Sequence, residues 1–381
     1  MTRRLEIRVE GMVQGVGFRP FVYGLATGLG LAGFVRNEPH GVEIEVEGVC
    51  SAVDTFVEQL GRSAPPLARV LRIQTKERPA CGSRGFEILQ SASSGSRSVL
   101  IAPDLAVCPD CLRELRDARD RRYRYPFINC TNCGPRYTII RDVPYDRAKT
   151  TMAEFSMCSA CRSEYEDPLN RRFHAEPTCC PECGPHMELL DSKGGRVSCA
   201  DPIAAAIRLL SEGRVLAVKG LGGFHLACDA QHEEAVRLLR RRKQRDLKPF
   251  ALMVGDFESV RRLCETSDGA LDFVGRPERP ILLLKKRHGH GIADGVAPRS
   301  DSFGVMLPYT PIHELLMEGP FAALVMTSGN LSDEPIAFTN EEAVKRLGDL
   351  ADFFLLHNRA IHIRTDDSVA RVIAGQQRFL R

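Results

Sequence analysis

The sequence predicts a multidomain chain that combines α+β and α/β folds, and three observations in its 381 residues support this prediction. Residues 1–91 follow the order strand, helix, strand, strand, helix, strand, which is the ferredoxin-like arrangement. Residues 92–195 contain a duplicated pattern of cysteine pairs. Residues 196–381 alternate apolar strand-like runs with helical stretches, as is typical of an α/β domain. We therefore expect three domains with these boundaries.

The elements of the first domain are predicted from the periodicity of its apolar residues and from the residues that interrupt it. A helix is expected to begin at Pro20, because proline lacks an N–H group that would be unpaired in the first helical turn in any case. A second helix is expected over Ser51–Leu60. The expected strands are Leu5–Val9, Gly33–Asn37, Val42–Glu47 and Val70–Lys76. The small polar residues of Ser91–Ser98 are typical of a linker.

Charge and cysteine usage narrow the classes of function. The net charge of +3, from 52 Lys plus Arg and 49 Asp plus Glu, is too small and too evenly spread for a dedicated nucleic-acid binder. No apolar run approaches the ~18 residues that span a bilayer, and no apolar segment follows the first arginines. We therefore expect a cytoplasmic chain with no membrane partner, whose 14 cysteines stay reduced. Eight of them form Cys-x2-Cys pairs, the spacing of metal ligands.

A glycine-rich turn between the first strand and the first helix predicts a phosphate-binding loop. Its glycines let backbone N–H groups converge on an anion at the helix N-terminus, and Arg19 adds a fork-shaped cation. The spacing matches neither a P-loop nor a dinucleotide-binding loop, and the glycines alone would also suit an ordinary tight turn. The residues expected in the loop are Gln14, Gly15, Val16, Gly17 and Phe18.

The string Val-Gln-Gly-Val-Gly-Phe-Arg19, followed by Phe-Val-Arg-Asn37, closely resembles the acylphosphatase family, and the resemblance covers residues 5–89. It implies that Arg19 binds the phosphate of an acyl phosphate and that Asn37 orients the attacking water. Such a hydrolysis needs stabilised charge on the phosphoryl oxygens and one oriented water. We expect both side chains at a surface anion site that supports no hydrophobic core.

The cysteine pairs form an internal duplication. Corresponding cysteines, such as Cys108 and Cys158, are 50 residues apart throughout. Eight thiolates suit two tetrahedral zinc sites that are closed and therefore structural. The expected ligands are Cys108, Cys111, Cys130, Cys133, Cys158, Cys161, Cys180 and Cys183. The sequence leaves open whether the pairs cross between the repeats and whether Cys179 substitutes for Cys180.

In the third domain, polar residues follow strands at the edge where ligands of open α/β sheets bind. Lys219 directly follows one strand, and the glycines after it would permit the close approach of a ligand. We expect both Lys219 and Lys248 to contact a nucleotide. The expected strands are Val215–Val218, Phe250–Val254, Ile281–Leu284 and Leu324–Met326.

Two short strings of this domain resemble the nucleotide-binding YrdC-like fold. They are Lys-x-Arg at Lys243 and Arg245, and Ser-x-Asn at Ser328 and Asn330. The resemblance implies that these residues hold the triphosphate of ATP while a carbamate-type oxygen attacks the α-phosphorus. Lysine and arginine would neutralise phosphate charge, and serine and asparagine would orient the phosphates by hydrogen bonds.

The three domains in this order, with the string from Arg122 to Pro135, closely resemble the HypF family of hydrogenase-maturation carbamoyltransferases. The resemblance implies hydrolysis of carbamoyl phosphate to carbamate and its adenylation by ATP with Mg²⁺ to carbamoyl-AMP. The carbamoyl group would then pass to the HypE protein for cyanide-ligand synthesis in NiFe hydrogenase maturation. Asp366 and Asp367 also match the family, and a carboxylate pair suits Mg²⁺, although their role stays open. Family members continue into a transferase domain with a His-rich metal motif, so we expect this chain to be shortened at Arg381.

Two other functions stay open on the sequence. One is threonylcarbamoyl-AMP synthesis for tRNA modification, although Lys219–His225 replaces the strings typical of that family. The other is a zinc-organised RNA-binding scaffold, because Arg121–Phe127 interleaves cations with aromatic rings that can stack on bases. For that run we expect local packing, or contact with the carbamoyl substrate or another domain, in preference to a nucleic-acid partner.

Overall fold

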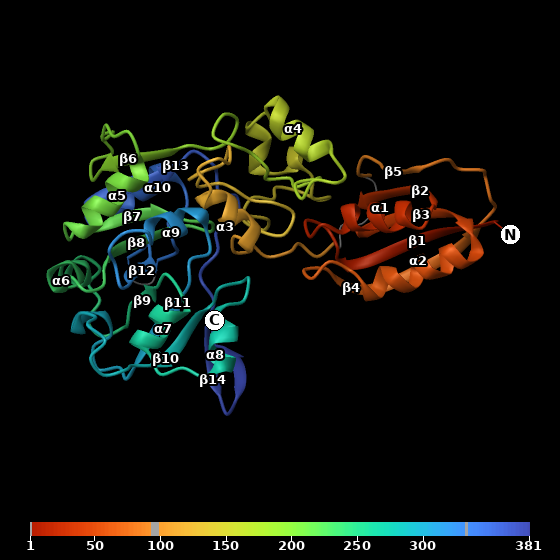
Figure 1. Ribbon diagram of the computed structural model, residues 1–381. Helices are drawn as coiled ribbons and strands as arrows, with labels where there is room; N and C mark the ends of the chain where they lie inside the picture. The colour runs from red at the N-terminus through yellow and green to blue at the C-terminus, as the bar shows by residue number, and fades with distance from the viewer. Residues whose placement is uncertain (1, 93–98, 332–333) are drawn as a thin grey trace. The chain divides into compact units, whose positions relative to one another are not determined.

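The structure is a computed structural model that describes residues 2–92, 99–331 and 334–381 (Figure 1). The predicted linker Ser91–Ser98 lies outside the described residues from position 93 onward. Internal contacts divide the chain into two compact units. Unit 1 comprises residues 1–104 and 129–184, and unit 2 comprises residues 105–128 and 185–381. The three-domain boundaries given above stay a prediction.

The N-terminal part of unit 1 is the predicted ferredoxin-like domain. Its strands are β1 (Thr2–Met12), β2 (Ala32–Glu38), β3 (Gly41–Val49), β4 (Arg69–Arg78) and β5 (Phe86–Ile88). The sheet has the order β4-β1-β3-β2-β5, and neighbouring strands are antiparallel except for the parallel pair β2 and β5. Helices α1 (Phe18–Gly28) and α2 (Cys50–Arg62) pack against this sheet and touch each other (Figure 1). The predicted element order is confirmed, and β5 adds a short edge strand.

Helix α1 begins at Phe18, two residues before the predicted start at Pro20. Gly17 precedes the helix with a φ of 73°, a left-handed conformation that glycine adopts without the steric penalty of a Cβ atom. Pro20 lies within the first turn, where its missing N–H group costs no helical hydrogen bond. Proline therefore marks the first turn correctly but not the first residue.

The remainder of unit 1, residues 129–184, is poor in regular structure, as predicted. It contains the 3-10 turns η1 (Arg147–Lys149) and η2 (Thr151–Glu154) and the helix α4 (Ser159–Glu166). The Arg147 guanidinium holds three carbonyls of this segment. It donates to the oxygens of Thr178 at 2.9 Å and Phe155 at 2.7 Å, and also to that of Glu176. One half-buried guanidinium therefore helps to hold together a segment that has little regular structure.

Unit 2 is built on a ten-stranded mixed sheet of order β15-β14-β10-β11-β9-β12-β8-β7-β13-β6. The strands are β6 (Met187–Asp191), β7 (Leu216–Lys219), β8 (Phe224–Asp229), β9 (Ala251–Met253), β10 (Ile281–Lys285), β11 (Ser302–Met306), β12 (Leu324–Ser328), β13 (Phe353–His357), β14 (Val369–Ile373) and β15 (Gln376–Phe379). Three neighbouring pairs are parallel: β13 with β7, β9 with β11, and β10 with β14. The four predicted strands appear as β7, β9, β10 and β12, and their ends differ from the predicted ones by at most two residues.

Most helices of unit 2 follow a residue whose side chain caps them, whereas α3 follows Cys108, which forms no such bond. Asp201, for example, accepts hydrogen bonds from the N–H groups of Ile203 and Ala204 and so satisfies two donors that have no partner inside the helix. The helices are α3 (Pro109–Arg116), α5 (Pro202–Ser211), α6 (Glu233–Arg242), α7 (Phe257–Leu263), α8 (Asp268–Val274), α9 (Pro311–Leu316) and α10 (Asn340–Leu347), with the 3-10 turn η3 (Asp294–Val296). Among the described residues, no helix has both the length and the apolar character needed to cross a membrane.

Candidate functional site

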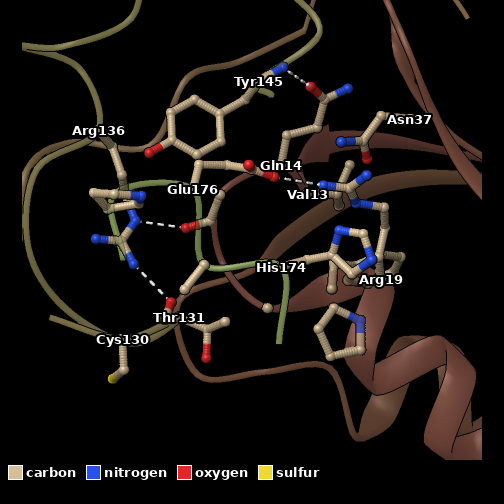
Figure 2. A pocket seen from close by; sticks show the side chains of 16 residues that line it. Val13, Gln14, Arg19, Asn37, Cys130, Thr131, Arg136, Tyr145, His174 and Glu176 are labelled. Atoms are coloured by element: carbon tan, nitrogen blue, oxygen red, sulfur yellow. Dashed lines mark hydrogen bonds and ion pairs between the residues drawn. The ribbon is translucent and has the colours of Figure 1, made fainter. Parts of the chain in front are cut away.

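The predicted phosphate loop of unit 1 connects β1 to α1 and is fixed by the side chain of Gln14. The Gln14 amide nitrogen donates to the carbonyls of Glu38 and Gly41, both at 2.8 Å. Its oxygen accepts from the backbone N–H of Tyr145 at 2.9 Å. Gln14 therefore fastens the loop to the β2–β3 turn and to the segment after the first cysteine repeat. This role differs from direct phosphate binding, although Gln14 lies beside the cavity (Figure 2).

Arg19 and Asn37, the two residues predicted to be catalytic, line one small cavity of about 20 Å³ (Figure 2). Such a volume holds about one water molecule. Arg19 is 8% exposed and Asn37 is 1% exposed, so the expectation of a surface anion site is wrong. The Asn37 Oδ1 atom is buried and has no hydrogen-bond partner among the described residues. A buried oxygen of this kind can accept a hydrogen bond from a molecule in the cavity.

The second half of this cavity comes from residues 129–184, which the sequence did not connect with the phosphate loop. Glu176 is the central addition, because it is 1% exposed and its Oε1 atom accepts from Nη2 of Arg19 at 2.9 Å. Its Oε2 atom accepts from the Arg147 N–H at 2.9 Å and from the Tyr165 hydroxyl at 2.8 Å. Burial raises the pKa of Glu176 to about 7. The further lining residues from this segment are Cys130, Thr131, Arg136, Tyr145, His174, Ala175 and Pro177.

His174 adds an uncharged imidazole to the cavity wall. Burial, followed by the positive charge of Arg19, lowers its pKa to about 3. Its backbone is left-handed with a φ of 51°, and Arg124, 50 residues earlier, has the same conformation with a φ of 53°. His174 and Glu176 stand where the first repeat has Arg124 and Pro126. Such departures between two otherwise similar repeats are the sequence signal that could have identified both residues.

Arg136 lines the cavity but serves the protein's own backbone. Its guanidinium donates to the carbonyls of Thr131 at 2.6 Å and Gly134 at 2.8 Å, and also to that of Gly15 in the phosphate loop. These bonds occupy the planar fork that would otherwise bind an anion. Within the cavity, Arg19 is therefore the guanidinium better placed to meet a phosphate.

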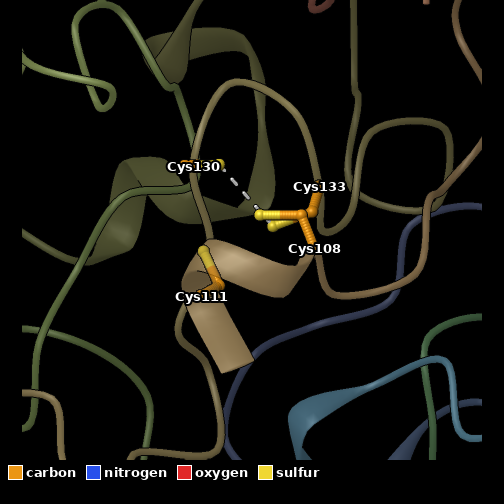
Figure 3. Close-up of side chains that lie close together, drawn as sticks. All are labelled: Cys108, Cys111, Cys130 and Cys133. Carbon is orange, nitrogen blue, oxygen red and sulfur yellow. Dashed lines mark hydrogen bonds between the residues drawn. The ribbon is translucent and has the colours of Figure 1, made fainter. Parts of the chain in front are cut away.

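The eight predicted metal ligands form two groups, one within each repeat. The groups are Cys108, Cys111, Cys130 and Cys133 (Figure 3), and Cys158, Cys161, Cys180 and Cys183. In each group one atom per residue lies within 4.8 Å of the others. Neither group contains Cys179 or pairs that cross between repeats.

The geometry of these groups fits tetrahedral metal coordination. At a Zn–S distance of about 2.3 Å, two sulfurs of a tetrahedral site lie about 3.8 Å apart. The Sγ atoms of Cys130 and Cys133 are 3.8 Å apart, and Cys180 lies 3.7 Å from Cys158 and 3.8 Å from Cys183. Four thiolates with no further donor form a closed site, which suits a structural zinc ion.

Unit 2 contains a larger cavity of about 540 Å³ at the predicted nucleotide site. Arg245, Lys248 and Ser328 line it, together with Asp366 and Asp367. The volume lies in the range of small-molecule and cofactor sites. Three of the six residues that the sequence predicts at the nucleotide site therefore line one cavity.

Arg245 is held at the cavity wall by polar and aromatic contacts. It donates to Thr327 Oγ1 at 2.8 Å and to the Pro249 carbonyl at 2.6 Å, and its guanidinium lies 5.0 Å from the centre of the Phe250 ring. Burial lowers its pKa to about 10, which still leaves it a cation at neutral pH. Its Nε also donates to the Lys248 carbonyl at 3.1 Å, so each guanidinium nitrogen has a protein partner and Arg245 presents a fixed positive charge at the cavity wall.

Lys243 and Asn330 are not among the residues that line the cavity, but both contact Ser328, which does. The Lys243 ammonium donates to the carbonyls of Ser328 at 2.7 Å and Asn330 at 2.6 Å. The Ser328 hydroxyl donates to Asn330 Oδ1 at 2.7 Å. Burial lowers the pKa of Lys243 to about 7. In this structure the two residues shape the turn that presents Ser328.

Lys219 and the glycines after it have a different role from the one expected. Lys219 does not line the cavity; its ammonium donates to Asn340 Oδ1 at 2.7 Å and to the His357 carbonyl at 3.0 Å. A Cβ atom on Gly222 would lie 1.9 Å from Thr365 Oγ1. The glycine therefore admits the protein's own Thr365 and not a ligand.

The two acidic residues after Thr365 reach the 540 Å³ cavity with partners of their own. Asp366 forms an ion pair with Arg381 at 3.0 Å, and Asp367 pairs with His225 at 2.8 Å. The His225 pair keeps the pKa of the Asp367 carboxyl below its usual value despite burial, which opposes the effect. Asp367 therefore faces the cavity as an anion.

Comparison with known proteins accounts for all parts of the chain. Family models match as acylphosphatase over residues 5–88, as HypF finger over residues 107–140 and 157–190, and as "Telomere recombination" (Sua5, YciO, YrdC) over residues 208–381. The "Carbamoyltransferase HypF2" of Cupriavidus necator is 53% identical over 97% of this chain and 48% of its own length. A crystal structure of full-length HypF in the phosphate- and nucleotide-bound form, 48% identical, superposes on 100% of this chain and 50% of that chain with a TM-score of 0.96. The chain belongs to the HypF family. It spans about half the length of the HypF relatives that it matches.

Shorter relatives match only the ferredoxin-like domain of this HypF chain. The "Acylphosphatase" of Methanospirillum hungatei is 36% identical over 87 residues, which are 96% of its own length and 23% of this chain. A protein of that length has no counterpart of residues 129–184. The cavity wall with His174 and Glu176 is therefore an addition to the acylphosphatase site in the HypF chain.

Proposed function

We propose that this chain hydrolyses carbamoyl phosphate to carbamate in unit 1 and adenylates the carbamate with ATP in unit 2. The observation that carries the proposal is that Arg19 and Asn37 line the same cavity, where the buried Oδ1 atom of Asn37 has no hydrogen-bond partner among the described residues. A phosphoryl group needs a cation, and its hydrolysis needs one oriented water. The name carbamoyltransferase of the HypF relatives supports carbamoyl phosphate as the acyl phosphate.

In the first step, a water oxygen bonds to phosphorus while the bond from phosphorus to the carbamoyl oxygen breaks. Carbamate leaves as an anion, and both protons of the water stay on the inorganic phosphate as dihydrogen phosphate. Arg19 and the loop amides would stabilise the charge on the phosphoryl oxygens, and Asn37 would accept a hydrogen bond from the water. Burial strengthens these interactions because little solvent competes with them.

In the second step, a carbamate oxygen bonds to the α-phosphorus of ATP and pyrophosphate leaves, giving carbamoyl-AMP. Arg245, Lys248 and Ser328 would contact the phosphates, with Lys243 and Asn330 supporting Ser328. Mg²⁺ would supply further charge neutralisation, and Asp366 is the residue we propose to hold it. Both carboxylates have a partner, but the ion pair of Asp366 with Arg381 is exposed, whereas Asp367 pairs with the buried His225. Transfer of the carbamoyl group to HypE is proposed for the part of HypF proteins that this chain does not span.

The two steps should be separable by mutation. Arg245→Ala should lower ATP–pyrophosphate exchange stimulated by carbamoyl phosphate by at least about tenfold, because it removes a phosphate cation. It should leave phosphate release from carbamoyl phosphate unchanged, since that reaction belongs to the other unit. Arg241→Ala, at an exposed position of helix α6 shortly before Arg245, is the matched control. Radiolabelled pyrophosphate and a phosphate assay measure the two reactions.

The reverse pattern is expected for Arg19→Ala, in which bicarbonate and ammonia, which form carbamate spontaneously, should restore the exchange. An exchange that needs threonine in place of carbamoyl phosphate would favour threonylcarbamoyl-AMP synthesis and overturn this proposal. So would carbamoylation of added HypE by this chain alone.

An RNA-binding role receives little support from the aromatic run 121–127. Arg122 is 1% exposed, and Tyr125 and Phe127 are also buried. Phe127 packs edge-on against the His357 ring at 5.2 Å, and the Arg359 guanidinium lies 5.2 Å from its centre. Arg122, Tyr125 and Phe127 thus pack within unit 2, whereas Arg121 and Tyr123 are exposed. Cytoplasmic localisation stays a prediction from the cysteine usage.

A further inference from the structure

The guanidinium of Arg19 is already matched with an anion in the described structure. Nη2 bonds to Glu176 Oε1 at 2.9 Å, and Nη1 lies 3.6 Å from Asp146 Oδ1. A guanidinium presents its donors in a fixed fork, so the edge that holds a carboxylate cannot hold a phosphate at the same time. A phosphoryl group that enters the cavity must therefore compete with Glu176 for Arg19.

Burial makes this competition strong. Glu176 is 1% exposed, so water and salt screen its charge poorly against an incoming dianion. Because burial has raised its pKa to about 7, the carboxylate can also be neutralised by a proton at physiological pH.

Glu176 does not depend on Arg19 to keep its place. Its other oxygen, Oε2, accepts from the Tyr165 hydroxyl and from the Arg147 N–H. These two donors remain when the Arg19 guanidinium turns toward a ligand. The carboxylate therefore stays in place and can bind Arg19 again after the ligand leaves. A side chain that only positions the arginine would not need these two additional donors.

We propose that the Glu176 carboxylate competes with phosphoryl groups for Arg19. It binds Arg19 in the absence of a phosphoryl group, releases Arg19 when a phosphoryl group enters, and binds it again so that inorganic phosphate dissociates. The inference rests on the proposed function only in requiring that Arg19 binds a phosphoryl group. It assigns to the second cysteine repeat a role in product release. The stand-alone acylphosphatase of Methanospirillum hungatei has no counterpart of this repeat and so lacks the competitor.

The competition has a defined pH dependence. Loss of Arg19 to an anion raises the pKa of Glu176 further, so anion binding takes up a proton and becomes tighter as the pH falls from alkaline values toward about 7. The titratable and charged groups around Glu176 include Arg19, Arg147, Asp146, His174 and the phenols of Tyr145 and Tyr165. Burial raises the pKa of Tyr145, so its phenol is neutral in this range. Burial raises the pKa of Tyr165 and lowers that of His174 to about 3, so both are neutral in this range.

The test is calorimetric titration of the full chain with sulfate, which stays a dianion across this pH range, and with inorganic phosphate. Glu176→Gln keeps the size of the side chain and its acceptor oxygen but removes the charge. At pH 8 it should bind sulfate roughly tenfold tighter than the wild type, the effect of one charged hydrogen bond. Product inhibition of carbamoyl phosphate hydrolysis by phosphate should become stronger by a similar factor. Glu154→Gln, which removes an exposed carboxylate paired with Arg141, should change neither.

Weaker or unchanged sulfate binding by a folded Glu176→Gln protein overturns the inference, since a positioning role predicts weaker binding. If the variant does not fold, the wild type alone decides: titrations near pH 7 in two buffers of different ionisation enthalpy should reveal proton uptake, and none would refute the competition. If the wild type binds neither anion, the proposed phosphate cavity itself is wrong. Binding with no effect of Glu176→Gln refutes only the present inference.

Discussion

Replacing Cys161 with serine should lower the zinc content of the chain from two ions to one and unfold the second cysteine repeat. Cys161 belongs to a closed group of four thiols, and the Sγ–Sγ distances of 3.7 and 3.8 Å within this group match a tetrahedral zinc site. Binding energy at a structural zinc site is folding energy, on the order of 10 kcal/mol in small zinc modules. A hydroxyl is a poor zinc ligand, so most of that energy should be lost. Elemental analysis gives the stoichiometry, and limited proteolysis locates the unfolded segment.

The control for this experiment is Cys199→Ser, which changes a cysteine that belongs to neither group. It should keep two zinc ions and the proteolytic resistance of the wild type. A Cys161→Ser protein that still holds two zinc ions, or a wild type with fewer than two, would contradict the assignment of both groups. Cys108→Ser should likewise remove one ion, because the first group has the same composition.

Local patterns were sufficient to predict the fold of each region. The first domain has period-2 strands and amphipathic helices in the ferredoxin-like order, and its sheet and helices follow from those patterns. The start of α1 was missed because Pro20 indicates a first turn and not a first residue, whereas Gly17 with its left-handed backbone sets the boundary. The weak edge strand β5 has three residues and too little periodicity to be predicted.

The cysteine spacing predicted which thiols bind metal but not how they are shared between two ions. Spacing of the Cys-x2-Cys type is compatible with pairing within or between repeats, because it constrains only neighbouring thiols. The fold selects pairing within each repeat. Helices α3 and α4 begin directly after Cys108 and Cys158, so each repeat places its first pair on a helical turn.

Contacts that are distant in the sequence account for what could not be predicted. Glu176 reaches Arg19 across 157 residues, and no local pattern connects a glutamate of a cysteine module with a phosphate loop. Gly222 shows the opposite limit, because a glycine suited to ligand approach is indistinguishable in sequence from one that admits Thr365. Lys219 is a second example: its position after a strand suggested a ligand contact, but its ammonium donates to Asn340 and to the His357 carbonyl.

Arg19→Ala and Asn37→Ala should each lower kcat/KM for carbamoyl phosphate hydrolysis roughly a hundredfold, which corresponds to about 3 kcal/mol of transition-state stabilisation. The first change removes the phosphate cation. The second removes the buried Oδ1 atom that is free, among the described residues, to accept from a water. Phosphate release from carbamoyl phosphate measures both. Asn37→Asp should retain part of the activity, because it keeps the acceptor atom.

The matched control is Arg36→Ala, the neighbour of Asn37 on β2, whose guanidinium pairs with Glu43 away from the cavity. It should hydrolyse carbamoyl phosphate at the wild-type rate.

Because Arg19 is buried and paired with Glu176, Arg19→Ala also leaves a carboxylate without its cation, and the carboxylate should take up a proton. Thermal unfolding followed between pH 6 and 8 separates this cost from catalysis: the stability deficit of Arg19→Ala relative to the wild type should grow as the pH rises through about 7, where Glu176 would otherwise ionise. Unchanged hydrolysis in a folded Arg19→Ala protein would show that the cavity does not bind the phosphoryl group.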